Sequence, residues 1–312
     1  MKLIESKAEY IPQASGLDGL YKHIELCGRT CYKSTDKITE ESAKPFVNKM
    51  IVSNHTAMLE QGTVYLFIPE KEYDKQLSLY SYGVKACERY GRIHFEEGGV
   101  YVTTNYRVIV EHNLYHLLDF ICDPTEYHDK RHTFKFTCDR GVSHEIVRSR
   151  VMSFAQESTR YCNYSKDKFS GEITYIIPSW FKTFNVEGKY DGEIRDGSGR
   201  VVIGGNVIQT SIDNIKEHYL CSRLHEAESA YMWLLKNGCS PQEARQVLPN
   251  ALKTEICVTG FASDWRFFFD LRLFGKTGKP HPDMLLLADK AKAEAERCGI
   301  WDDIMRYPSK FD

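Results

Sequence analysis

The chain has 312 residues, of which 42% are hydrophobic and 27% are charged, a normal balance for a soluble globular protein. Its formal net charge is −2, from 41 basic and 43 acidic residues. A protein that binds nucleic acid usually has a basic excess, because its affinity comes from neutralising phosphates. The near balance argues against such a protein and restricts any basic site to a local cluster, which suits a small anionic ligand.

The remaining bulk features point to a cytoplasmic protein. No apolar run approaches the length of a membrane span, and the N-terminal MKLIESKAEY lacks the apolar core of a signal peptide. The ten cysteines include no CxxC pair, so we expect reduced thiols and no metal site.

The first third of the chain predicts helices followed by strands. Apolar spacing favours helices over residues 18–34 and 38–52. The run Thr63–Pro69 is β-branched and aromatic, which is typical of a strand. A second strand is expected at Gly99–Thr104 and a helix at Asn105–Ile121.

The middle of the chain predicts a strand, a helix and a loop. His132–Thr137 alternates polar and apolar residues, and we expect this strand to pair with Thr63–Pro69. A helix should follow over Asp139–Arg150, then a loop as far as Ser158, and a strand over 159–164.

The last third is predominantly helical after a Gly-, Asp- and Ser-rich stretch. Residues 185–206 predict a hairpin excursion, in which Ile194 and Val201–Ile203 pair across Asp196–Gly199. Helices are expected over 207–237, Ser240–Gln246, Asp264–Phe274 and Pro282–Cys298. The order indicates one α+β domain over residues 1–312, with a mixed or antiparallel central sheet flanked by helices.

Chemistry-bearing side chains concentrate in Arg140–Tyr161, which reads RGVSHEIVRSRVMSFAQESTRY. An arginine cluster near a helix end is often solvated or paired with acids, and Asp139, Glu145 and Glu157 are available for that role. Polar and cationic side chains in one short turn, however, suit phosphate and base edges. Those side chains are Gln156, Ser158, Arg160 and Tyr161.

The same segment resembles the signature of the flavin-dependent thymidylate synthase (ThyX) family. Arg148-Ser149-Arg150 is followed after seven residues by Ser158 and then by Arg160-Tyr161. Three further segments are similar to segments of that family, in the same order: His55–Glu60, Ala244–Gly260 and Asp264–Arg272.

The resemblance implies a mixed α/β homotetramer that converts dUMP to dTMP with FAD, NADPH and methylenetetrahydrofolate, at active sites built from several chains. It implies no catalytic cysteine, and Ser158 and Arg272 are the implied catalytic residues. The implied nucleotide-binding residues are Arg140, Glu145, Arg148, Gln156, Ser158, Arg160, Tyr161, Arg245 and Arg272. The implied cofactor-binding residues are His55, Arg148, Ser149, Arg150 and Gln156.

The departures from the family pattern lie on the flavin side. Ser149 replaces the central histidine of the signature, Ala57 a small hydroxylic residue, and Phe261 and Phe267 replace polar residues. Each lost hydrogen bond would weaken FAD binding by roughly 1 kcal/mol or more. Two alternatives therefore stay open. One is an enzyme that modifies a related deoxynucleotide or uses another flavin or carbon donor, and the other is a nucleotide-binding or assembly subunit that has lost catalysis.

Overall fold

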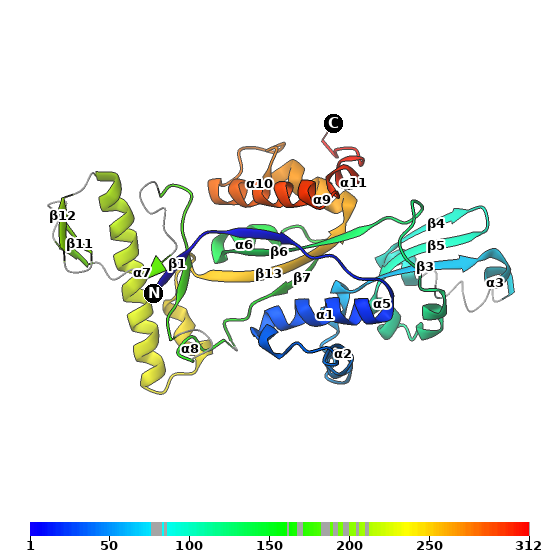
Figure 1. The fold of residues 1–312 in the computed structure, drawn as a ribbon, viewed down its shortest axis with the longest axis horizontal. Helices are drawn as coiled ribbons and strands as arrows, with labels where there is room; N and C mark the ends of the chain where they lie inside the picture. Colours follow the sequence, from blue (N-terminus) through cyan, green and yellow to red (C-terminus); the bar gives the residue numbers. More distant parts are fainter. Residues whose placement is uncertain are drawn as a thin grey trace.

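The computed structural model describes residues 1–75, 83, 86–160, 162–166, 171–181, 188–189, 193–195, 200–203, 206–209 and 212–311. These residues form an elongated molecule with a central sheet between two layers of helices, a smaller sheet at one end and a long helix at the other (Figure 1). No helix in these ranges is both long and apolar enough to cross a bilayer.

The central sheet has the strand order β2-β6-β13-β7, and every neighbouring pair is antiparallel. Its strands are β2 (Lys7–Tyr10), β6 (Arg131–Asp139), β13 (Lys253–Phe261) and β7 (Ser153–Gln156). Alternation along β6 places Phe134 and Phe136 on one face and Thr133 on the other. The predicted α+β class with an antiparallel central sheet is confirmed.

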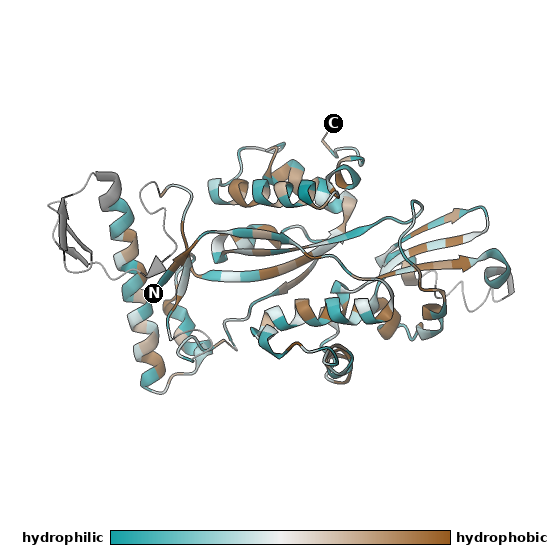
Figure 2. Cartoon of the chain, in the orientation of Figure 1, coloured by the Kyte–Doolittle hydropathy of each residue, from teal (hydrophilic) through white to brown (hydrophobic). Residues whose placement is uncertain are grey.

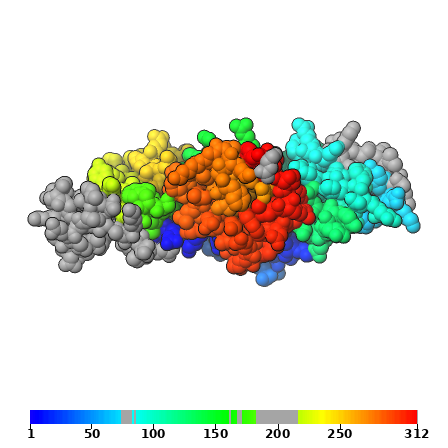
Figure 3. All heavy atoms as spheres, turned by 90° about the horizontal axis from the view of Figure 1, so that it is seen from above, coloured from blue at the N-terminus to red at the C-terminus, as the bar shows by residue number. Residues whose placement is uncertain are grey.

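Each face of this sheet is covered by helices. Helices α9 (Ala262–Arg272), α10 (Pro282–Arg297) and α11 (Trp301–Met305) cover the first face, as seen from above in Figure 3. There the fully buried Trp265 packs against Phe134, with ring centroids 4.6 Å apart. Helices α1 (Gly16–Tyr32) and α2 (Ala43–Val52) lie on the opposite side (Figure 1). Apolar and polar residues alternate along α1 and α10, as expected for helices with one face on a core (Figure 2).

A second sheet has the order β3-β5-β4, formed by β3 (Thr63–Pro69), β5 (Gly99–Asn105) and β4 (Arg92–Glu96). The predicted pairing of His132–Thr137 with Thr63–Pro69 is therefore wrong, because β3 pairs with β5 and β6 pairs with β13 and β2. Alternation identifies a strand and its buried face but not its partner.

One predicted helix also differs from the structure. The helix expected over Asn105–Ile121 is broken into α5 (Tyr106–Glu111) and the 3-10 helix η3 (Tyr115–Phe120). Asn113 between them has φ of 55°, a left-handed conformation that cannot continue a helix.

The signature region differs more. Helix α6 spans only Arg140–Ile146, and the residues expected to form a loop include strand β7, which pairs with β13. No strand is present in the described part of 159–164. Long-range pairing with β13, which local pattern does not encode, defines the strand here.

The remaining elements complete the two ends of the molecule. Helix α7 (Ile212–Lys236) is followed by α8 (Pro241–Ala244) and η5 (Arg245–Val247). In the Gly-rich stretch Ile194 pairs with Val201, while Asp196–Gly199 lie outside the described residues. The other elements are β1 (Lys2–Ile4), η1 (Thr35–Lys37), η2 (Thr56–Gln61), α3 (Glu70–Lys75), β8 (Thr174–Ile176), β9 (Gly188–Lys189), β10 (Glu193–Arg195), β11 (Arg200–Ile203) and β12 (Asn206–Gln209).

Candidate functional site

Helix α6 carries the first of the predicted nucleotide-binding residues, and hydrogen bonds fix its start. Asp139 is the N-cap, and its Oδ1 accepts from the backbone N–H of Val142 at 2.8 Å. The backbone N–H of Arg140 donates to the carbonyl of Asn250 at 2.9 Å. The Nη1 atom of Arg140 is buried without a hydrogen-bond partner among the described residues. An unpaired buried donor is costly, so this guanidinium has capacity for one further acceptor.

The fold brings Arg272 to Glu145, although 127 positions separate them. Nη1 of Arg272 donates to Oε2 of Glu145 at 2.7 Å, and Nη2 donates to the Glu145 carbonyl at 3.0 Å. Arg272 ends α9 and Glu145 lies in the last turn of α6, so one side chain joins the two helices. The side chain of Arg148, two residues after α6, is exposed.

Gln156 is held at the end of β7 in one orientation. Its Nε2 donates to Ser143 Oγ at 2.9 Å and to Thr254 Oγ1 at 3.2 Å. Ser143 uses its own proton on the carbonyl of Arg140, at 2.8 Å, and therefore accepts from the Gln156 amide. The amide oxygen of Gln156 is left as an acceptor.

Ser158 and Arg245 lie beyond the end of β7. The backbone N–H of Ser158 donates to the carbonyl of Cys31, at the end of α1, at 3.0 Å. Ser158 Oγ accepts from the backbone N–H of Arg160 at 3.3 Å, and Arg245 donates to Thr159 Oγ1 at 3.1 Å. Tyr161 lies outside the described residues.

Glu157 points away from its two neighbours into a buried ionic cluster. Its Oε2 lies 2.8 Å from Lys253 Nζ, which in turn lies 2.9 Å from Glu255. Lys33 and Lys135 also approach Glu255, at 2.7 and 3.6 Å. Burial by itself would raise the pKa of Glu255, but the lysines outweigh it and lower that pKa to about 2. The cluster anchors the backbone between Gln156 and Ser158.

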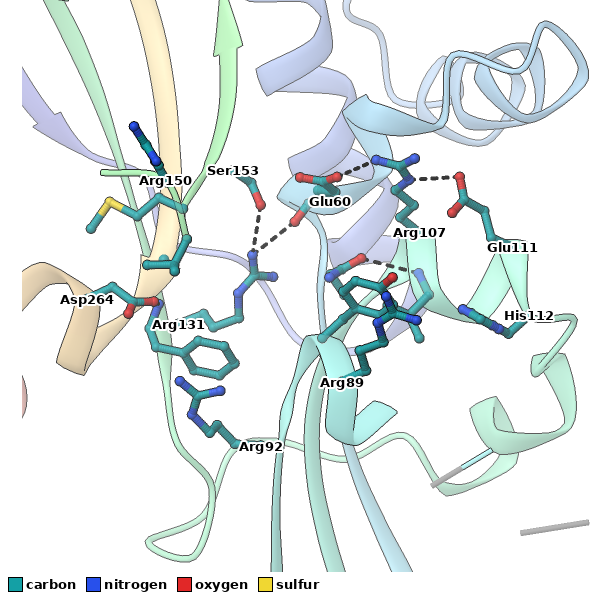
Figure 4. A pocket seen from close by; sticks show the side chains of 17 residues that line it. Glu60, Arg89, Arg92, Arg107, Glu111, His112, Arg131, Arg150, Ser153 and Asp264 are labelled. Carbon is teal, nitrogen blue, oxygen red and sulfur yellow. Dashed lines mark hydrogen bonds and ion pairs between the residues drawn. The ribbon is translucent and has the colours of Figure 1, made fainter. Parts of the chain in front are cut away.

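Arg150 belongs to a different place, a cavity of about 470 Å³ between the central sheet and the β3-β5-β4 sheet. Four further arginines line it: Arg89, Arg92, Arg107 and Arg131. Figure 4 shows Arg150 and Asp264 on one side, Arg89, Arg107 and His112 on the other, and Arg131 between them. The five arginines face three carboxylates, from Glu60, Glu111 and Asp264, so the lining carries an excess of positive charge.

Arg107 forms two ion pairs, whereas Arg131 forms none with the described residues. Arg107 contacts Glu60 at 2.6 Å and Glu111 at 2.8 Å. In the described part of the chain Arg131 donates to three neutral oxygens, Ser153 Oγ, Thr63 Oγ1 and the Glu60 carbonyl, at 3.1 to 3.3 Å. Burial lowers the pKa of its guanidinium, which nevertheless stays protonated near neutral pH.

The four positions that depart from the family pattern, and the predicted cofactor-binding residue His55, are spread over the molecule. Phe261 lines the cavity, whereas Phe267 stacks on Phe311 with ring centroids 5.6 Å apart. His55 and Ala57 are exposed, and Ser149 is half-buried. The cavity lining includes none of His55, Ala57 and Ser149.

Sequence reasoning missed the arginines that line the cavity with Arg150. Arg89, Arg92 and Arg107 belong to a stretch without a motif, and Arg131 directly precedes the predicted strand His132–Thr137. The only available signal was indirect: a balanced net charge requires any basic site to be local.

The comparisons with known proteins agree with the signature. The sequence profile of the family described as "Thymidylate synthase complementing protein" matches residues 128–297. The flavin-dependent thymidylate synthase of Pyrococcus furiosus is 28% identical over 144 residues, which are 45% of this chain and 46% of that protein. That of Corynebacterium efficiens is 31% identical over 133 residues, 43% and 45% of the two chains. The matched segment thus spans about half the length of these curated relatives.

A crystal structure of the UMP/dUMP methylase PolB from Streptomyces cacaoi, bound with 5-Br dUMP, has a TM-score of 0.44 and 14% identity. The alignment covers 98% of this chain and 97% of that chain. The family profile matches more than half of the 312 residues. The chain therefore belongs to the thymidylate synthase complementing protein family, the flavin-dependent (ThyX) family whose signature its Arg148–Tyr161 segment resembles.

Proposed function

We propose that this protein is a flavin-dependent thymidylate synthase. The reaction is dUMP + methylenetetrahydrofolate + NADPH + H⁺ → dTMP + tetrahydrofolate + NADP⁺. Family membership supports it, and so do relatives named flavin-dependent thymidylate synthases. The observation that carries it is the Glu145–Arg272 pair at 2.7 Å, because it joins α9, in the family-like segment Asp264–Arg272, to α6, which directly precedes the signature.

The nucleotide-binding residues have complementary roles in this proposal. The guanidinium groups of Arg140, Arg148, Arg160 and Arg245, with the Ser158 hydroxyl and Tyr161, suit a dianionic phosphate. The fixed amide oxygen of Gln156 suits a pyrimidine N–H donor. Ser158 and Arg272 are proposed to contact the uracil ring and stabilise charge that develops on it, with Glu145 keeping Arg272 in place.

The cavity beside Arg150 suits part of a flavin dinucleotide in charge and in size. It combines uncompensated guanidinium groups with the aromatic face of Phe261. When bound, FAD supplies the two-electron transfer that side chains cannot. His55, Arg148, Ser149, Arg150 and Gln156 are proposed to hold it, and of these Arg150 lines the cavity.

The chain is proposed to work as one domain over residues 1–312 in a homotetramer. Within the chain, Gln156 and Arg272 are fixed by different partners, and neither lines the cavity that Arg150 lines. Subunits that contribute residues to one another's sites would bring these groups around one nucleotide and one cofactor.

Phe261 and Phe267 favour one alternative: a diverged family member that binds or modifies a deoxynucleotide with altered or lost flavin use. The sequence leaves these positions without the hydrogen-bonding groups expected there.

A spectrum and a titration separate the two readings. The purified protein is expected to show a visible flavin band after incubation with FAD and removal of the unbound fraction, and to oxidise NADPH in the presence of dUMP and methylenetetrahydrofolate. Calorimetric titration should show tighter binding of dUMP than of deoxyuridine. Retained dUMP affinity without flavin would instead support the alternative.

The nucleotide site has a test of its own. Arg148→Ala combined with Ser158→Ala should lower the affinity for dUMP by about 10-fold or more, because a charged hydrogen bond is lost. The affinity for deoxyuridine, which lacks the phosphate, should fall much less. Unchanged dUMP affinity would show that these residues do not bind the nucleotide.

A further inference from the structure

The cavity between the two sheets is lined from two regions of the chain. Arg131, Arg150 and Phe261 lie within the residues that match the family profile. Arg89 and Arg92 lie outside them, in a short helical turn at 86–90 and at the start of β4. Family membership therefore does not explain why Arg89 and Arg92 line the cavity.

Among the described residues these guanidinium groups form no direct ion pair, although the carboxylate of Asp264 acts on Arg92 and Arg131 without contacting them, and that of Glu60 on Arg131. Arg89 and Arg92 are exposed and form no ion pair with any described residue. Arg131 is half-buried, and its hydrogen-bond acceptors among the described residues are all neutral oxygens. Partial burial of a charge without a counterion in contact is costly, and an anion in the cavity would supply that contact.

Phe261 holds two of the arginines in position. The guanidinium carbon of Arg92 lies 4.7 Å from the centroid of the Phe261 ring, and that of Arg131 lies 5.7 Å from it. Both distances are within the range of cation–π attraction. Arg92 also donates to the Gly91 carbonyl at 3.0 Å. An otherwise flexible exposed side chain is thus ordered beside the cavity, which lowers the entropy lost when a ligand binds.

We propose that Arg89, Arg92 and Arg131 form a phosphate-binding site for a nucleotide cofactor, with Phe261 as its scaffold. The planar fork of arginine suits phosphate oxygens, and a cavity of about 470 Å³ is large enough for part of a dinucleotide. Phe261 then makes no hydrogen bond to the cofactor itself. It holds Arg92 in place, and Arg92 binds the phosphate. The assignment to a cofactor rests on the proposed function, whereas the affinity for phosphate does not.

Two cofactors could supply the phosphate, the diphosphate of FAD or the 2′-phosphate of NADPH. Calorimetric or fluorescence titration of the full-length chain should therefore compare FAD with riboflavin, which has no phosphate, and NADPH with NADH, which lacks one. Arg92→Ala and Arg89→Ala are the test variants. Arg297→Ala is the matched control, since Arg297 is an exposed arginine at the end of α10, outside the cavity.

If FAD supplies the phosphate, Arg92→Ala should raise its Kd roughly 10- to 100-fold and leave riboflavin unchanged. If NADPH supplies it, the same variant should abolish the preference for NADPH over NADH. Arg92→Lys should recover part of the affinity, because it keeps the charge but loses the planar fork. Equal behaviour of Arg92→Ala and Arg297→Ala toward both cofactors would overturn the assignment.

Inorganic pyrophosphate separates this site from the proposed reaction. Wild-type protein should bind it with an affinity that falls with added salt and with Arg92→Ala. If the protein binds no flavin yet shows this pattern, the synthase proposal is wrong and the phosphate site stands. If the protein methylates dUMP but Arg92→Ala affects neither pyrophosphate nor a cofactor, the phosphate site is wrong and the synthase proposal stands.

Discussion

At the scale of single residues, Glu157, Lys253 and Glu255 show how a buried ionic cluster supports a site that it does not enter. Gln156 and Ser158 stand on either side of Glu157, which is 3% exposed and bonded to Lys253. Side chains alternate along an extended chain. The ionic bonds of the inward-pointing Glu157 therefore also fix the backbone that carries Gln156 and Ser158, whose side chains point the other way. Glu157, available in sequence as a partner for the arginines, is instead paired with a lysine.

The lowered pKa of Glu255 predicts a specific dependence of stability on pH. Its folded-state pKa of about 2 lies below the ordinary value of 4.5, so the stabilisation is fully present above pH 4.5 and is lost as the pH falls toward 2. The contribution is on the order of 3 kcal/mol. Glu255→Gln should lower the free energy of urea unfolding at pH 7 and flatten its decline between pH 4.5 and 2.

The matched control is Glu296→Gln, which breaks an exposed pair with Lys292 on α10. This change should alter the free energy of unfolding by less than about 1 kcal/mol. Identical pH profiles for the wild type and Glu255→Gln would contradict the assigned pKa.

At the scale of elements, α6 links the nucleotide-binding residues to the sheet although it has only 7 residues. So short a helix has little stability of its own and depends on its cap and its contacts. Asp139 caps the first turn, and Arg272 is hydrogen-bonded to Glu145 in the last turn. The position of Glu145 therefore depends on residues at both ends of α6.

Removing the cap should loosen this arrangement. Asp139→Ala is expected to destabilise the protein by about 1 kcal/mol and to weaken dUMP binding, because Glu145 and Arg272 lose their fixed geometry. Asp139→Asn should retain most of both properties, since asparagine caps helices equally well. Thermal unfolding and dUMP titration would test this, and equal losses in both variants would show that the charge of Asp139 matters instead of its cap.

At the scale of the whole molecule, α7 presents aromatic side chains to solvent. Tyr219 is 59% exposed and Trp233 is 63% exposed. They are 14 positions apart, close to four helical turns, so both lie on one face of the helix. Large exposed aromatic groups on one face suit burial against another subunit, and aromatic residues are enriched at such interfaces.

In the proposed homotetramer, a second copy of the chain would cover this face of α7. Wild-type protein should have a mass in solution of four times 36.1 kDa, measured by light scattering. Trp233→Glu should shift it toward smaller species, because a charge would be buried at the contact. Phe95→Glu is the control, since Phe95 is also 63% exposed but lies on β4. A tetramer unaffected by Trp233→Glu would place the contact elsewhere.

The sequence by itself determined the α+β class, most of the helices and the family. Long apolar periodicity made helices such as α1 and α10 predictable, and the spacing from Arg148 to Tyr161 carried the family signature. These features depend on local pattern or on residues close together in the chain. The strand β7 was missed because it is defined by its pairing with β13, about 100 positions away.

Only the tertiary structure decided which residues meet. It joined Arg272 to Glu145, placed Arg150 apart from Gln156 in a cavity, and surrounded that cavity with Arg89, Arg92 and Arg131. No spacing rule links these arginines, because strands and helices from distant parts of the chain bring them together. Their significance is electrostatic: positive charges that are scattered in the sequence and balanced in total become concentrated at one place by folding.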